Sequence, residues 1–418
     1  MMSARLGFPF LLAFVVVDYL RPQDWIGPLA GTPIALVAVI PVAMCLLGAT
    51  QRKVILDPVS VAMASIVAFA AAWVPFATNN FFAFEAFKFL IVAWVLMLAI
   101  ATFVDRPARL RALLALLLAI FSVQAISALR SGGRGSNTYF GDENDLALGL
   151  NIALPFAVLG IGGVRGLAVK AALVAASVLL VAGVVASSSR GGLVGLAAAA
   201  GALALMSRRR LAVLLGMLLA VAALASLAPA AYWDDMRTMF DPADATREER
   251  IHQWHQARTV WRDNPWLGVG PGNIPWVMSN YENYDNLTTR SMSGRAVHSM
   301  YFTVLPEYGL FGTALYVFLL GAAATHCAVV IRRGRGQSAA DADPWARAIL
   351  ASGVACLGGA AFISVLLYPH LYYLVGLSMA VRSIGLGAAA PRVAPRAAAW
   401  AVPLPSPFGV EPVRGLRS

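Results

Sequence analysis

Residues 84–128 read FEAFKFLIVAWVLMLAIATFVDRPARLRALLALLLAIFSVQAISA, two long apolar runs joined by a short basic segment. The runs cover 84–104 and 108–128, and the segment between them contains Arg106. A helix rises 1.5 Å per residue, so about 20 residues cross the roughly 30 Å of hydrocarbon in a bilayer. The stretch therefore predicts two consecutive membrane-spanning helices.

The same pattern extends over most of the chain. Hydrophobic residues make up 59% of the sequence and charged residues 13%, whereas about 25% of residues are charged in soluble domains. This composition excludes a soluble globular protein and predicts an all-α polytopic membrane protein with about 12 transmembrane helices. The predicted spans are 6–20, 29–49, 58–78, 84–104, 108–128, 145–163, 167–186, 190–206, 211–230, 299–331, 345–366 and 369–389.

Basic residues are concentrated in alternate connections between these spans. With a cytoplasmic N-terminus, nineteen Lys and Arg residues fall on the cytoplasmic side and four in the short loops opposite. This bias satisfies the positive-inside rule. It predicts that both the N- and C-termini are cytoplasmic and that the longest polar loop faces the periplasm.

The chain divides into four regions on this basis. Residues 1–230 hold the first nine predicted spans, 231–298 form the large periplasmic loop, and 299–389 hold the last three spans. Residues 390–418 are rich in proline and are expected to form a disordered cytoplasmic tail.

The large loop concentrates polar chemistry outside the predicted membrane. Residues 233–297 contain seven of the 32 Lys and Arg residues. Apolar residues at spacings of three and four predict an amphipathic helix over 246–261, which carries Arg247, Arg250 and Trp254. The following segment, NPWLGVGPGN at 264–273, predicts a tight and ordered turn.

Arg190 follows three serines at the predicted start of a helix, in SSSRGG at 187–192. A guanidinium binds phosphate oxygens through two parallel hydrogen bonds, and free helix N-terminal amides and Ser189 add further donors. This arrangement indicates a phosphate site. The alternative is an arginine that extends to the membrane interface without binding a ligand.

His298 stands where the large loop returns to the membrane. A histidine at a helix N-terminus has its pKa lowered by the helix dipole, stays neutral at physiological pH and suits a general base. The alternative is a hydrogen-bonding residue without a chemical role. Glu307 lies nine residues further along the same predicted helix. An ionisable group at that depth is either functional or paired with a buried basic residue.

Taken in order, these motifs resemble the O-antigen ligase and Wzy-type polymerase superfamily. They are SSSRGG, Arg250 with Trp254, NPWLGVGPGN, His298-x-x-Tyr301, and Glu307-x-Gly309-x-x-Gly312. The resemblance is strongest from Ser187 to Gly312. The segment GDENDLA at 141–147 also looks like the family's asparagine-containing start of a middle helix and carries Asn144.

The resemblance implies a membrane-embedded, GT-C-like inverting glycosyltransferase of the bacterial inner membrane that needs no metal and no cofactor. Its donor would be a glycan on undecaprenyl pyrophosphate, and its acceptor a hydroxyl of lipid A core or another surface molecule. His298 matches the family's essential histidine, and Arg190 and Arg250 match its pyrophosphate-binding arginines. Candidates for supporting roles are Arg247, Trp254, Ser189, Tyr301, Glu307 and Asn144. The family commonly has Asn after this histidine, whereas this chain has Ser299.

Three activities remain open on the sequence. An O-antigen ligase transfers a finished polysaccharide to its acceptor, and a Wzy-type polymerase joins carrier-linked repeat units by the same chemistry. Both act on lipid or glycan partners in the membrane, and neither requires a nucleic acid. The third activity is a transporter or flippase of lipid-linked glycan, which the absence of an inverted repeat disfavours. Length and the single dominant loop favour the ligase.

Overall fold

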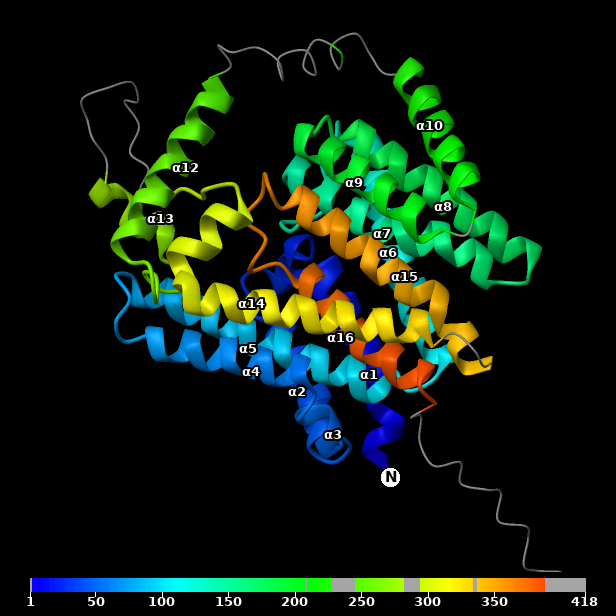
Figure 1. The fold of residues 1–418 in the computed structure, drawn as a ribbon, viewed down its shortest axis with the longest axis horizontal. Coiled ribbons are helices and arrows are strands. Elements are labelled where there is room, and N and C mark those ends of the chain that lie inside the picture. The colour runs from blue at the N-terminus through cyan, green and yellow to red at the C-terminus, as the bar shows by residue number, and fades with distance from the viewer. Residues whose placement is uncertain are drawn as a thin grey trace, which may run out of the picture.

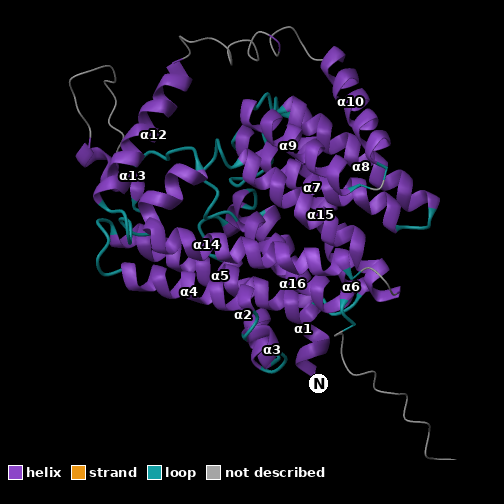
Figure 2. Ribbon diagram, viewed as in Figure 1, coloured by secondary structure: helices purple, strands orange, loops and turns teal. Residues whose placement is uncertain are grey.

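A computed structural model of the 418-residue chain describes residues 2–207, 209–227, 233, 245–281, 294–333 and 337–387. Within these ranges the chain forms helices joined by turns and loops, without a β-strand (Figures 1 and 2). The predicted all-α class is confirmed.

Each of the twelve predicted spans contains a helix in the described part of the chain. Six segments are long and apolar enough to cross a membrane: Leu6–Asp24, which includes most of the first helix, and α5, α6, α7, α8 and α14. The number of crossings in the whole chain stays a prediction. The twelve helices are α1 (Met2–Leu20), α2 (Ile34–Leu47), α4 (Pro58–Trp73), α5 (Asn80–Phe103), α6 (Pro107–Arg130), α7 (Glu143–Gly163), α8 (Leu167–Ala186), α9 (Arg190–Met206), α10 (Arg210–Leu227), α14 (Met300–Arg332), α15 (Gln337–Gly359) and α16 (Pro369–Gly385).

Shorter elements lie between these helices. The amphipathic helix expected in the large loop is present as α12 (Ala245–Asp263). The described residues also form η1 (Pro22–Asp24), η2 (Gly27–Leu29), α3 (Arg52–Ile55), α13 (Ile274–Val277) and η4 (Met278–Tyr281). Two expectations lie outside the described residues, namely the tail at 390–418 and the side chain of Arg247.

Several predicted span boundaries differ from the observed helix ends: α2 begins at Ile34 rather than at 29, and α4 ends at Trp73 rather than at 78. The difference that matters for the candidate site concerns α15. The span expected at 345–366 corresponds to α15, which ends at Gly359, and residues 360–368 form an irregular connection to α16. This connection is apolar in sequence, so hydropathy alone does not distinguish it from helix.

The helices α7 and α16 form the centre of the bundle. Side chains are buried on every face of α7 from Leu146 to Ala157, and α16 is buried from Pro369 to Val381. Around them, α7 packs against α8, α9 and α15, while α16 packs against α5, α14 and α15. A helix that is apolar all round is expected at such a buried position.

Several loops distant in sequence meet at one end of the bundle, here called the loop end. It comprises residues 131–142, 187–189, 264–273, 298–299 and 360–368. Hydrogen bonds join these loops to helix ends: Asn137 Nδ2 donates to the Tyr19 carbonyl at 2.8 Å, Ser189 Oγ to Asn144 Oδ1 at 2.7 Å, and the Asn79 N–H to Asn273 Oδ1 at 2.7 Å. The loop end brings together the segments that were predicted to share one side of the membrane.

A buried ionic cluster joins three helices at the opposite end of the bundle. Asp57, the N-cap of α4, lies 3.2 Å from Arg382 Nη1 of α16 and 3.4 Å from His326 Nε2 of α14. Asp57 and His326 are both buried. Because an unpaired buried charge is costly, these contacts fix α4, α14 and α16 relative to one another.

The helix α14 is interrupted at Gly309, whose φ of 61° and ψ of −168° are not helical. The interruption frees backbone groups on both sides, and the turn at 264–273 pairs with them. The N–H groups of Val269 and Gly270 donate to the carbonyls of Pro306 and Glu307, at 2.8 and 3.0 Å. Beyond the break, the N–H of Leu310 donates to the Pro265 carbonyl at 2.8 Å. The turn therefore docks into α14 through its backbone.

Glu307 completes this docking. Its side chain is buried at 4% exposure, and its carboxylate accepts hydrogen bonds from the backbone of Gly272 and, at 3.3 Å, from the N–H of Ile274. The basic partner considered in the sequence analysis is not needed, because backbone N–H groups of the docked turn bind the carboxylate.

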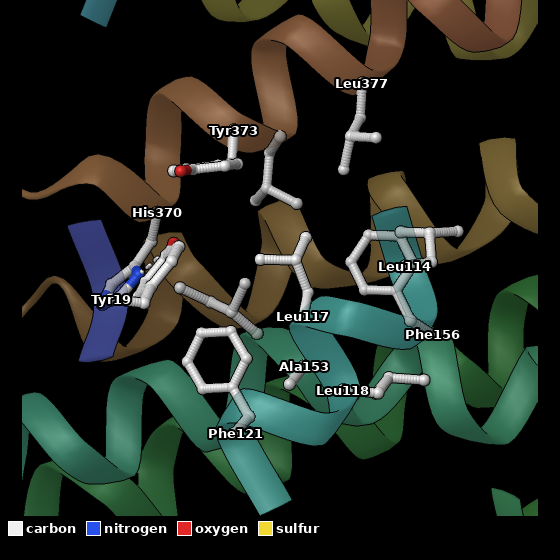
Figure 3. A pocket seen from close by; sticks show the side chains of 12 residues that line it. Tyr19, Leu114, Leu117, Leu118, Phe121, Ala153, Phe156, His370, Tyr373 and Leu377 are labelled. Carbon is white, nitrogen blue, oxygen red and sulfur yellow. Dashed lines mark hydrogen bonds between the residues drawn. The ribbon is translucent and has the colours of Figure 1, made fainter. Parts of the chain in front are cut away.

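A small apolar pocket lies inside the bundle between α6, α7 and α16 (Figure 3). Tyr19 and His370 line one part of it and are hydrogen-bonded at 2.9 Å. None of the candidate site residues lines this pocket. Its apolar lining includes Leu114, Leu117, Leu118, Phe156 and Leu377.

We expect Gly309→Ala to lower the free energy of unfolding by about 2 kcal/mol or more. A Cβ at this position would overlap the backbone of Trp266 and Leu267, and the backbone conformation is accessible only to glycine. Thermal unfolding of the purified protein in detergent measures the effect. The control is Gly321→Ala in the same helix, where a Cβ meets nothing within 4 Å. This control should be neutral or stabilising by up to about 1 kcal/mol. Equal stability of the two variants would contradict the proposed importance of the break.

Candidate active site

Arg190 is the first residue of α9, and the turn before it is tightly organised. Ser189 is the N-cap: its Oγ accepts a hydrogen bond from the Gly192 N–H at 2.8 Å and donates to Asn144 Oδ1 at 2.7 Å. Ser188 has a φ of 52°, a left-handed conformation that is uncommon for serine. Arg190 is half-buried. The turn thus holds the arginine at a fixed point of the loop end.

The start of α7 lies against this turn. Asp142 is the N-cap of α7, and its Oδ1 accepts from the backbone N–H of Asn144 at 2.8 Å and from Asn144 Nδ2 at 3.1 Å. Asn144 therefore links two helix N-termini, because it donates to Asp142 and accepts from Ser189. These contacts are structural, and the supporting role expected from sequence stays a prediction.

The helix α12 holds the segment before His298 in place. Trp254 Nε1 donates to the Val297 carbonyl at 3.2 Å, and its ring stacks on Phe302 at 5.1 Å with an interplanar angle of 8°. On the same helix, Glu249 forms an ion pair with Arg295. The Trp254–Val297 hydrogen bond and the Glu249–Arg295 ion pair thus join α12 to the segment just before His298. The half-buried Arg250 lies on the same helix, between Glu249 and Trp254.

His298 has a strained backbone between two buried neighbours. Its φ is 53°, whereas Val297 and Ser299 are buried at 0% and 1% exposure. A non-glycine residue in this region costs about 1 to 3 kcal/mol and persists only where its surroundings enforce it. His298 itself is partly covered by protein and partly exposed to solvent. The fold therefore directs the imidazole to a surface at the cost of backbone strain, as is frequent at functional sites.

Burial and four charged groups determine the protonation of His298. Partial burial lowers its pKa below the usual 6.5, and the positive charges of Arg250 and Arg295 lower it further. The carboxylates of Asp142 and Glu249 act in the opposite direction. The lowered pKa was predicted, but burial and arginine charges account for it here rather than the helix dipole. At neutral pH the ring is mainly uncharged and able to accept a proton.

The connection between α15 and α16 completes the site and was missed in the sequence analysis. The Met300 N–H donates to the Ala360 carbonyl at 2.9 Å, so this connection binds the first residue of α14. At the start of α9, a Cβ on Gly191 would lie 3.0 Å from Phe362 Cβ. Residues 360–362 therefore bridge the turns that carry Arg190 and His298. The one sequence signal for a loop here is the Gly358-Gly359 pair, a typical helix terminator.

Two of the candidate supporting residues have structural roles. Tyr301 donates from its hydroxyl to the Leu357 carbonyl at 2.8 Å and so attaches α14 to α15. Glu307 holds the docked turn, as described above. Neither contact points to chemistry at His298.

The fold and this arrangement define a helical membrane protein with a polar, arginine-containing site at one end of its bundle. Residues 175–317 of the chain match the family model Wzy_C, described as O-antigen ligase. The segment carries an O-antigen ligase domain, and the resemblance seen in the sequence is confirmed. The match includes Arg190, Arg250 and His298 and ends within α14.

The matched segment is 143 of the 418 residues, or about a third of the chain. Members of this family are glycosyl-transferring ligases or polymerases. No curated protein matches the chain.

We expect Trp254→Phe to loosen the His298 segment without unfolding the bundle. Phenylalanine keeps the stacking on Phe302 but removes the hydrogen bond to Val297, at a cost of about 1 kcal/mol. Hydrogen exchange monitored by mass spectrometry should show faster exchange near Val297. The matched control is Trp266→Phe, because Trp266 is 70% exposed. Unchanged exchange in Trp254→Phe would contradict the role assigned to this contact.

Proposed function

We propose that the protein is an O-antigen ligase-like inverting glycosyltransferase. It moves a glycan from undecaprenyl pyrophosphate to a hydroxyl of lipid A core or another surface acceptor. One observation supports the proposal: Arg190, Arg250 and His298 all lie within the O-antigen ligase domain. The turn before Arg190 and His298 itself belong to the loop end, and α12, which carries Arg250, is joined to the segment before His298. The site faces the periplasm of the bacterial inner membrane in this proposal.

Arg190 and Arg250 would bind the pyrophosphate of the donor. Both residues are half-buried, and partial burial strengthens the interaction of a charge with an anion relative to water. Arg190 also stands at the N-terminus of α9, where the helix dipole favours negative charge. Together they would stabilise the charge that develops on the leaving group, so the reaction requires no metal ion.

His298 would act as the general base. The acceptor hydroxyl oxygen attacks the anomeric carbon from the face opposite the pyrophosphate, and a new glycosidic C–O bond forms as the bond to the pyrophosphate oxygen breaks. The hydroxyl proton moves to the uncharged imidazole, and undecaprenyl pyrophosphate leaves. Attack from the opposite face inverts the anomeric configuration. The lowered pKa of His298 keeps the ring available for this proton at neutral pH.

We expect His298→Ala and Arg190→Ala to lower transfer by about 100-fold or more. Each variant removes a group that acts on the transition state. In cells whose only copy carries either change, glycan should accumulate on the undecaprenyl carrier and disappear from the final acceptor. Long chains on the carrier identify a ligase, whereas single repeat units identify a polymerase. The measurement is gel and mass-spectrometric analysis of the carrier-linked glycan.

Arg258→Ala provides the control. Arg258 lies on α12 with Arg250 but its side chain is exposed, so its loss changes the charge of the helix without touching the proposed site. Its activity should stay within about twofold of the original protein. Full activity in His298→Ala or Arg190→Ala would remove that residue from the mechanism.

A further inference from the structure

The turn that docks into α14 carries two large apolar side chains on its outer surface. Trp266 and Leu267 are 70% and 54% exposed. No Asp, Glu, Lys, Arg or His occurs from Asn264 to Tyr281, although the rest of the large loop is rich in charged residues. Soluble proteins rarely leave a large apolar patch in contact with water. The turn therefore presents a surface suited to an apolar partner.

The length of α14 places this surface relative to the membrane. The helix has 33 residues and is about 50 Å long, whereas the hydrocarbon core of a bilayer is about 30 Å thick. The part after the break, from Phe311 to Ile331, contains no Asp, Glu, Lys or Arg and is about 30 Å long by itself. It ends before Arg332 and Arg333, which lie on the predicted cytoplasmic side. The break at Gly309 therefore lies at the opposite boundary of the hydrocarbon.

The apolar surface of α14 leads directly to the turn. Val317 and Phe318 are exposed on the part of the helix that is long enough to cross the membrane, where lipid is their natural neighbour. Leu310 and Phe311 are also exposed, and they lie about two helical turns earlier on the same face. The lipid-facing stripe of α14 thus reaches up to the break.

The docked turn extends this stripe. The N–H of Leu310 donates to the Pro265 carbonyl at 2.8 Å, and the N–H of Phe311 donates to the Trp266 carbonyl at 3.1 Å. These two hydrogen bonds place Trp266 and Leu267 beside the last exposed residues of the stripe. The apolar surface is therefore continuous from α14 into the large loop.

The rest of the segment lies across the neighbouring ends of α4 and α5. A Cβ on Gly270 would lie 3.1 Å from the ring of Trp73, the last residue of α4. Trp276 stacks on Phe82 near the start of α5, with ring centroids 4.6 Å apart. Phe81 beside it is exposed. Aromatic side chains thus gather at the ends of three helices, as they do at the boundary between hydrocarbon and water.

We propose that residues 264–276 lie in the membrane interface, with Trp266 and Leu267 inserted among the lipids. The partner is the bilayer itself, at the level where headgroups meet hydrocarbon. A tryptophan is favoured there because its ring is apolar and its indole N–H can bind headgroups or water. Irregular backbone is costly in contact with lipid, and the hydrogen bonds to α14 provide the partners that it needs.

Insertion of the turn has a consequence for the large loop. Part of the region expected to face the periplasm would instead be anchored in the membrane, directly after α12. The anchor would hold α12, with Arg250 and Trp254, close to the membrane surface. This anchoring does not depend on the chemistry at His298, so it can be tested without substrate.

Nitroxide labels on introduced cysteines test the insertion. Trp266→Cys and Leu267→Cys each replace an exposed side chain, so neither should disturb the fold. The native cysteines are all buried, and labelling of the original protein checks that they do not react. In vesicles of phosphatidylethanolamine and phosphatidylglycerol, electron paramagnetic resonance measures collisions of the label with oxygen, which concentrates in lipid, and with a water-soluble nickel complex.

Two further positions calibrate the measurement. Phe318→Cys is the lipid reference on α14, and Arg258→Cys on the exposed face of α12 is the water reference. Collisions with oxygen should exceed those with nickel at residues 266, 267 and 318, and the order should reverse at 258. Frequent nickel collisions at 266 and 267 would place the turn in water and overturn the proposal. Low rates with both reagents would show that protein covers the turn, which would equally overturn its contact with lipid.

Discussion

The fold depends on the rule that backbone N–H and C=O groups within a bilayer need partners inside the protein. The break in α14 at Gly309 interrupts the helical hydrogen bonds of an apolar segment. The docked turn at 264–273 provides new backbone partners for the groups on both sides of the break. A loop that would otherwise be a surface connection thus becomes part of the bundle. The carboxylate of Glu307 adds a further contact to the turn.

This docking has consequences for the site. The turn follows α12, so fixing it to α14 also limits where α12 can lie. Trp254 of α12 then reaches Val297 and Phe302 on either side of His298. The position of Arg250 relative to the imidazole is therefore set by contacts at both ends of the segment between α12 and α14, rather than by the arginine itself.

Much of this was predictable from sequence, for identifiable physical reasons. Hydropathy located all twelve helical segments because apolar runs of this length form helices in a bilayer. Motif order located the segments of Arg190, Arg250 and His298. Contacts between helix ends were not predictable. Asn144 and Ser189 are hydrogen-bonded although they lie 45 residues apart in the sequence. Residues 360–362 are apolar, so their sequence resembles that of a membrane helix. The docking of the turn also escaped prediction, because it uses backbone groups whose partners depend on tertiary position.

The direction of the helices explains why the site forms at the loop end. The helices α7, α9 and α14 all begin there, and the partial positive charge of a helix lies at its N-terminus. Arg190 and Arg250 add positive charge, which favours the pyrophosphate of the proposed donor and disfavours a protonated histidine. In the proposed reaction this charge suits the first stage, when the donor is bound and the base is neutral, and opposes the transfer of a proton to the ring. The carboxylates of Asp142 and Glu249 raise the pKa of His298 and so partly offset the effect of Arg250 and Arg295, which lower it.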